Sequence, residues 1–105
     1  MAYRVLIDPV AQDQIDRFAE YLRAYSEPFA VDQIDRLQRI LQFDIGESPL
    51  MWGHFPLTGA PYRGYLFRVG RRTQYGIIYT VDEVSRTVSI LSFWNTARDS
   101  KTLDL

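Results

Sequence analysis

Hydrophobic residues recur at helical spacing in the first half of the chain, which predicts two consecutive helices after a short strand. The β-rich run 3–7 ends at Asp8-Pro9, which is typical of a helix start because the carboxylate caps free N–H groups and proline fits the first turn. The apolar positions of the first helix are Ala11, Ile15, Phe18, Ala19 and Leu22. Those of the second, which follows Ser26-Glu27-Pro28, are Ala30, Ile34, Leu37 and Leu41. We expect Gly46 to end the second helix, which gives a helical hairpin with a very short connection.

The second half of the chain predicts a sheet. After an irregular loop over 47–61, punctuated by proline and glycine, the segments 62–69, 74–81 and 86–93 alternate as strands do. In the middle strand we expect Tyr75, Ile77, Tyr79 and Val81 on one face. Three consecutive strands can form an antiparallel meander, and the first strand must join it along one edge or beside the last strand. The predicted fold class is α+β with the order β-α-α-β-β-β. It is a single domain over residues 1–105 in which a two-helix hairpin packs on one face of a small, mostly antiparallel sheet.

Composition narrows the chemistry. With 47% hydrophobic and 24% charged residues, the chain is typical of a folded soluble domain. No run approaches the roughly 18 apolar residues of a membrane span, and the N-terminus does not resemble a targeting peptide, so a cytoplasmic location is expected. The chain has no cysteine and one histidine, His54, which makes a metal site improbable, and no cofactor is expected.

The small net charge hides an uneven distribution along the chain. Residues 1–61 carry five arginines against nine acidic residues, whereas residues 62–105 carry six arginines and Lys101 against four acidic residues. The basic half contains the three consecutive strands, so we expect the sheet face away from the helices to be cationic and free for a partner. The alternative is that helix surfaces are simply rich in acids, and the net charge of −1 weighs against strong nucleic-acid binding.

Several motifs, in their order and spacing, resemble those of the RelE/ParE superfamily of bacterial type II toxins. They are Tyr3-Arg4-Val5, Asp8-Pro9-Val10-Ala11, Pro49 and Gly53 ahead of Tyr62-Arg63, Tyr75-Gly76-Ile77-Ile78-Tyr79, and Ser92-Phe93-Trp94-Asn95-Thr96-Ala97-Arg98-Asp99. The resemblance spans nearly the whole chain. It implies the toxin of a plasmid-stabilising toxin–antitoxin system, which a cognate antitoxin protein neutralises by wrapping its surface with helices and an added strand.

The superfamily has two modes of action, and the residues favour one of them. RelE-like members are ribosome-dependent mRNA endonucleases, whose chemistry needs cations and a group that moves a proton. In that branch an arginine usually follows the aromatic residue of the penultimate strand, but Gly76 follows Tyr75 here, and no tyrosine or histidine comes after Tyr79. ParE-like members lack the nuclease residues and inhibit DNA gyrase by binding it. The sequence therefore favours a ParE-like, non-enzymatic toxin.

Two alternatives stay open. One is a RelE-like endoribonuclease acting on mRNA in the ribosome, for which the catalytic candidates are Arg68, Arg98 and His54. The other is a binding module of the same fold that is not toxic. His54 has no nucleophile or carboxylate fixed beside it by spacing, which weakens its assignment as a general base.

The candidate partner-binding residues come from the basic half and its aromatic positions. They are Arg63, Arg71, Arg72, Tyr75, Trp94 and Arg98. Arg98 is the first choice because it lies just past a strand end, although an ion pair with Asp99 or with a helix acid would also explain it.

The other candidates have structural alternatives too. Arg71 and Arg72 lie at a hairpin tip, where they could serve turn formation and solubility. Tyr75 could pack in the core, and Trp94 could cover one end of it. Arg63 and Arg68 are five residues apart on one strand, so we expect them on opposite faces, with at most one on the free face.

Overall fold

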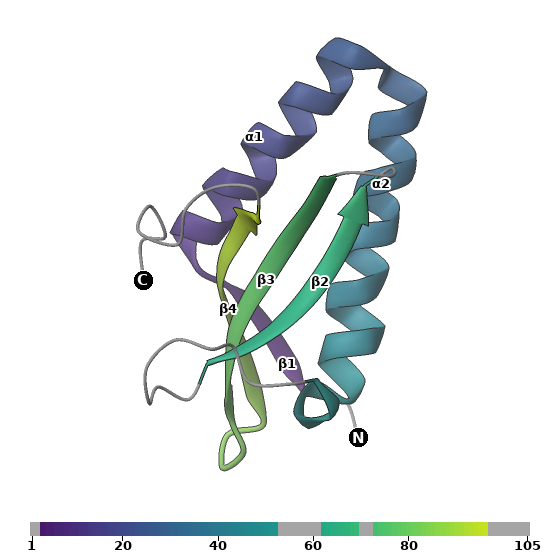
Figure 1. The fold of residues 1–105 in the computed structure, drawn as a ribbon. Helices are drawn as coiled ribbons and strands as arrows, with labels where there is room; N and C mark the ends of the chain where they lie inside the picture. Colours follow the sequence, from purple (N-terminus) through teal and green to yellow (C-terminus); the bar gives the residue numbers. More distant parts are fainter. Residues whose placement is uncertain (1–2, 53–61, 70–72, 97–105) are drawn as a thin grey trace.

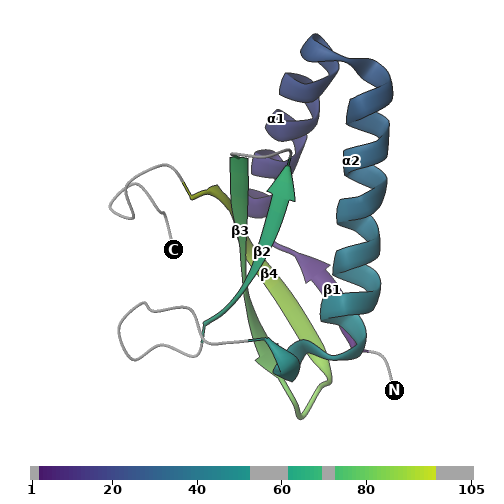
Figure 2. The same cartoon turned by 45° about the vertical axis from the view of Figure 1, so that its right-hand side comes forward.

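The computed structural model describes residues 3–52, 62–69 and 73–96. The elements are β1 (Arg4–Ile7), α1 (Pro9–Tyr25), α2 (Glu27–Arg39), a π-helical turn (Ile40–Ile45), a 3-10 turn (Pro49–Met51), β2 (Arg63–Val69), β3 (Thr73–Asp82) and β4 (Thr87–Asn95). The sheet order is β1-β4-β3-β2, with β1 parallel to β4 and the other pairs antiparallel. Figures 1 and 2 show both helices on the same side of this sheet. The α+β class and the β-α-α-β-β-β order are confirmed, and β1 lies both at an edge and beside the last strand.

The helix starts follow the predicted caps. The Asp8 carboxylate accepts a hydrogen bond from the Val10 N–H at 3.0 Å, and Pro9 is the first helical residue. Ser26 serves both helices: its N–H donates to the Leu22 carbonyl and its hydroxyl accepts from the Phe29 N–H. One residue thus ends α1 and begins α2, which makes the hairpin connection very short.

Gly46 caps the end of the helical run that α2 begins, as predicted, but without the left-handed conformation expected of a glycine cap. The chain passes from α2 into one wide π-helical turn, and Gly46 itself has the right-handed helical φ of −64°. Its missing side chain serves close packing instead, because a Cβ there would lie 3.2 Å from Cγ2 of Val5 and 3.1 Å from the Leu41 carbonyl oxygen. The Tyr3 N–H also donates to the Gly46 carbonyl at 2.7 Å. Gly46 therefore lets the first strand approach the end of this helical segment.

The core lies between the helix pair and one sheet face. As predicted, Tyr75, Ile77, Tyr79 and Val81 all face it from β3. From α1, Phe18 reaches three aromatic side chains of the sheet, with ring centroids 6.1 Å from Phe67, 4.8 Å from Tyr75 and 5.0 Å from Phe93. In the described part of the chain, no helix is long and apolar enough to cross a membrane.

Truncation of Phe18 tests how much of the stability depends on this contact. Phe18→Ala removes a buried ring and leaves a cavity, so we expect the free energy of unfolding to fall by about 3–5 kcal/mol. Val31→Ala, at an exposed position of α2, should change it by less than about 0.5 kcal/mol. Urea denaturation followed by circular dichroism measures both, and a loss below about 1 kcal/mol for Phe18→Ala would contradict this packing.

Candidate functional site

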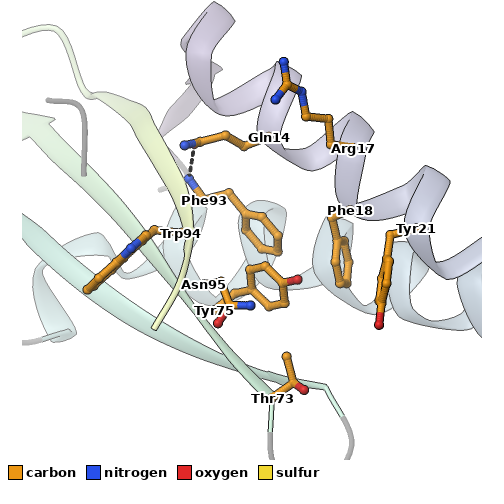
Figure 3. A pocket seen from close by; sticks show the side chains of 9 residues that line it. All are labelled: Gln14, Arg17, Phe18, Tyr21, Thr73, Tyr75, Phe93, Trp94 and Asn95. Carbon is orange, nitrogen blue, oxygen red and sulfur yellow. Dashed lines mark hydrogen bonds between the residues drawn. The ribbon is translucent and has the colours of Figure 1, made fainter. Parts of the chain in front are cut away.

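A cleft of about 520 Å³ opens between α1 and the ends of β3 and β4 (Figure 3). It is lined by Gln14, Arg17, Phe18, Tyr21, Thr73, Tyr75, Phe93, Trp94 and Asn95. The short first strand explains its place: β1 ends at Ile7, opposite Ile90, so α1 rather than a strand lies beside the last part of β4. A cleft of this size, with aromatic walls and a few polar groups, is a typical binding site.

The floor of the cleft is a rigid aromatic stack. The rings of Tyr75 and Phe93 lie parallel, 4.5 Å apart with an interplanar angle of 8°, and Phe18 packs edge-on against Tyr75. Tyr21, one turn further along α1 than Phe18, is 71% exposed at the rim. The cleft therefore combines a fixed apolar floor with an exposed ring that a partner can contact.

Polar side chains of α1 form the rim. The Gln14 side-chain oxygen accepts hydrogen bonds from the Phe93 N–H at 2.8 Å and from the Ser92 hydroxyl at 3.3 Å, which joins α1 to the free side of β4. Arg17 pairs with Asp13 at 3.0 Å, and both side chains are largely exposed. An exposed pair of this kind is worth only about 0–1 kcal/mol, so Arg17 can exchange Asp13 for a partner's acid at little cost.

The sheet face away from the helices differs from the expectation of a free cationic surface. At its centre Ile78 and Ser92 are fully buried, and Gly76 is buried as well. The indole of Trp94 lies over Gly76, where a Cβ would come 3.5 Å from its Cε3 atom. The expectation is therefore wrong at the centre of this face, because a glycine there leaves room for a large ring to lie across the sheet.

Arg63 and Arg68 lie on opposite faces of β2, as predicted. Arg63 points to the helix side, where its guanidinium donates to the carbonyls of Leu50 and Trp52. It thereby holds the turn that follows the π-helical segment, which is a structural role. Arg68 is exposed on the other side of the strand.

Tyr75 and Trp94 both line the cleft, but in different ways. Tyr75 belongs to the stacked floor, whereas the Trp94 indole turns away from Phe93 toward the opposite sheet face (Figure 3). The other site candidates, His54, Arg71, Arg72 and Arg98, lie outside the described residues.

Sequence reasoning missed the part of the cleft that α1 contributes. Gln14, Arg17 and Tyr21 are spaced three and four residues apart, which places them along one helix face next to the buried stripe. That spacing is a usable signal, but it becomes meaningful only once β1 is known to stop short of the end of β4.

Two tyrosine hydroxyls on the helix side have strongly raised pKa values. Burial raises the pKa of Tyr79 to about 12, and its hydroxyl donates to the Pro49 carbonyl at 2.6 Å. Burial, followed by the hydrogen bond to the Asp44 carboxylate, raises the pKa of Tyr65 to about 12. Both phenols therefore stay protonated at neutral pH and act as hydrogen-bond donors, not as bases. Within the described ranges, no three histidine, aspartate or glutamate side chains gather to hold a metal ion.

The comparisons with known proteins bear on the fold. No protein-family model matches the sequence, and none of the curated proteins matches it. Among solved structures, the chain is similar to a chain in the crystal structure of the toxin–antitoxin complex RelBE2 from Mycobacterium tuberculosis. The TM-score is 0.60 at 18% identity, and the match covers 90% of this chain and 99% of that chain. At this identity the likeness shows the fold alone, which is the α+β arrangement described above.

The raised phenol pKa values predict a loss of stability in alkali. Above pH 10.0, the ordinary tyrosine value, the unfolded chain releases phenolic protons that Tyr65 and Tyr79 retain in the folded state. The contribution of these two phenols to the free energy of unfolding is therefore complete below pH 10.0 and is lost as the pH approaches 12. For one tyrosine, the free energy of unfolding falls by at most about 1.4 kcal/mol per pH unit.

Urea denaturation at pH 8, 10 and 11 of the wild type and of Tyr79→Phe measures this effect. At pH 8 the free energy of unfolding of the variant should be about 1–2 kcal/mol lower than that of the wild type, because the Pro49 carbonyl loses its donor. As the pH rises, this free energy should fall less steeply in the variant. Tyr25→Phe, which changes an exposed phenol, is the control. If the free energy of unfolding fell equally steeply with pH in the wild type and in Tyr79→Phe, the raised pKa of Tyr79 would be contradicted.

Proposed function

We propose that this chain is the toxin component of a toxin–antitoxin pair and is neutralised by a cognate antitoxin. The observation that carries the proposal is the fold match, which extends over 90% of this chain and 99% of a chain from a toxin–antitoxin complex. The motifs from Tyr3 to Asp99 that resemble RelE/ParE toxins support it independently of the fold comparison.

Its mode of action, in this proposal, is binding to a protein target, as ParE-like toxins bind DNA gyrase, and not RNA cleavage. The centre of the described sheet face carries Gly76, Ile78, Ser92 and Trp94, of which the first three are buried, and these four residues include neither a cation nor a proton-transfer group for a ribose hydroxyl. Tyr65 and Tyr79, with pKa values of about 12, are held protonated on the other side. These observations favour a binding protein over a nuclease.

The cleft is the surface through which we expect it to hold a protein partner. Aromatic rings that are fixed in place lose little conformational freedom on binding, and such residues dominate the affinity of protein interfaces. The Tyr75–Phe93 stack provides that floor, while Tyr21 and Arg17 supply an exposed ring and a cation at the rim.

Controlled expression in a bacterial host tests the toxin assignment. We expect growth arrest that co-expression of the protein encoded next to this gene relieves. Purified protein should inhibit supercoiling by DNA gyrase, whereas primer extension on translated mRNA should show no new cleavage sites. Ribosome-dependent cleavage would support the endoribonuclease alternative, and binding without growth arrest would support the non-toxic module; either result overturns the proposed mode of action.

A tyrosine pair on α1 tests the cleft. Tyr21→Ala removes the ring at the rim and should weaken binding of the neutralising or target protein by about tenfold or more. Truncation of an aromatic anchor in an interface typically costs about 2 kcal/mol or more, which corresponds to about a thirtyfold loss of affinity when the whole cost is realised. Tyr25→Ala is the matched control, since Tyr25 is 81% exposed on the same helix but does not line the cleft. Isothermal titration calorimetry measures both affinities. Equal losses of affinity for the two variants would exclude the cleft as the partner-binding surface.

A further inference from the structure

Two tyrosines present ring surface to the cleft in front of a fixed aromatic background. Phe18 and Phe93 are buried, and they contact the Tyr75 ring edge-on and in parallel, respectively. Tyr75 itself is half-buried, and Tyr21 is exposed at the rim (Figure 3). A planar ring that enters the cleft therefore meets aromatic surfaces of which most are already held in place. This arrangement favours an aromatic ligand over a flexible aliphatic one, because little conformational freedom is lost on binding.

The charge of the cleft is positive. Among the lining residues that the structure describes, Arg17 is the one charged side chain, and none of them is a carboxylate. The Asp13 carboxylate that pairs with Arg17 at 3.0 Å does not line the cleft, and both side chains of the pair are largely exposed. Such a pair opens at little cost. An anionic ligand can therefore take the place of Asp13 on Arg17, whereas a cationic ligand is repelled.

The side chain of Gln14 adds donors to this charge. Its carbonyl oxygen accepts from the Phe93 N–H at 2.8 Å and from the Ser92 hydroxyl at 3.3 Å, which uses both lone pairs of that oxygen. The group that remains for a ligand is the amide nitrogen, which can only donate. The α1 side of the cleft therefore suits a ligand group that accepts hydrogen bonds.

We propose that the cleft is also a binding site for a small, planar aromatic carboxylate, with its ring against Tyr21 and Tyr75 and its carboxylate on Arg17. A cleft of about 520 Å³ has the usual size of a small-molecule site. A carboxylate carries one negative charge and two acceptor oxygens, which match one guanidinium. A phosphate group carries up to about twice that charge, so a nucleotide fits this single cation less well.

Such a ligand would regulate the chain by competition. In the proposed function the same cleft holds a protein partner, so an aromatic carboxylate bound to Tyr21 and Arg17 would exclude that partner. This second step rests on the proposed function. The binding of the aromatic carboxylate does not rest on it.

Nuclear magnetic resonance on the full chain tests the site with naphthaleneacetate as the probe. A ligand of this size typically binds with a dissociation constant of about 1 mM, so the titration extends to several times that concentration. We expect saturable shifts of the Phe93 amide and of the Trp94 indole N–H. The Trp52 indole N–H donates to the Asp44 carbonyl away from the cleft, so it is the internal control and should not shift.

The charge preference is tested with naphthylmethylammonium, which has the same rings and the opposite charge. It should bind at least about threefold more weakly than naphthaleneacetate, because Arg17 repels it. Arg17→Gln should remove this difference between the two probes. Arg39→Gln is the matched control, since it breaks an equally spaced exposed pair with Asp35 on α2, and it should leave the difference unchanged.

The contribution of the ring is tested separately. Tyr21→Ala should weaken the binding of naphthaleneacetate about three- to tenfold, because one ring–ring contact is lost. Tyr25→Ala changes an exposed tyrosine of α1 that does not line the cleft and should leave the affinity unchanged. Acetate alone, at the same concentration, should produce none of the shifts.

Competition tests the regulatory step. With naphthaleneacetate at ten times its dissociation constant, the affinity for the neutralising or target protein should fall about tenfold by mass action. An unchanged affinity for that protein would overturn the regulatory step.

The outcomes that overturn the binding site are distinct. Unchanged Phe93 and Trp94 resonances, or equal shifts at Trp52, would exclude an aromatic site in the cleft. Equal affinities of the wild type for the two charged probes would exclude the preference for a carboxylate. Tighter binding of adenosine monophosphate than of naphthaleneacetate would assign the cleft to nucleotides. These results can be obtained whether or not the chain arrests growth, so failure of the site is distinguishable from failure of the proposed function.

Discussion

The packing of Phe18 onto the sheet is the contact on which the rest of this structure depends. Its ring touches Phe67, Tyr75 and Phe93, so one residue of α1 joins β2, β3 and β4. Aromatic pairs at these distances add directional preference to the burial of apolar surface. The same contact fixes how far α1 lies from the ends of β3 and β4, and it thereby sets the depth of the cleft.

The four-stranded sheet is small, and groups from the helical segments satisfy single backbone positions at its two edges. Gln14 of α1 satisfies the Phe93 N–H where β1 stops short, and Gly46 accepts from Tyr3 beside β1. Arg36 of α2 caps the Arg68 carbonyl on the opposite side. Free sheet edges promote unwanted pairing, so these caps restrict where another chain can add.

A second set of contacts fixes the turn that follows α2. Arg63 holds the carbonyls of Leu50 and Trp52, and Tyr79 donates to Pro49. Buried backbone carbonyls need donors, and these two side chains of the sheet provide them. Arg63 shows why a count of arginines misjudges a binding surface: charge along the sequence does not distinguish a cation facing solvent from one that satisfies a loop. The second half of the chain is indeed richer in basic residues, but one of its arginines, Arg63, binds loop carbonyls and does not face solvent.

Local chemistry determined the class of fold. Asp8-Pro9 and Ser26 set the helix starts, the apolar stripes set which helix faces are buried, and strand alternation set the face of β3 that carries Tyr75 and Tyr79. Each of these depends on residues within one or two turns of each other. Only the tertiary structure decided the features that require contact between segments far apart in the sequence. These are the length over which β1 pairs with β4 and the close approach of Gly46 to Val5. They also include the packing of Trp94 over Gly76 and the cleft along α1. Side-chain periodicity specifies which face of an element is buried, but only the packed chain specifies what that face meets and which edge is left open.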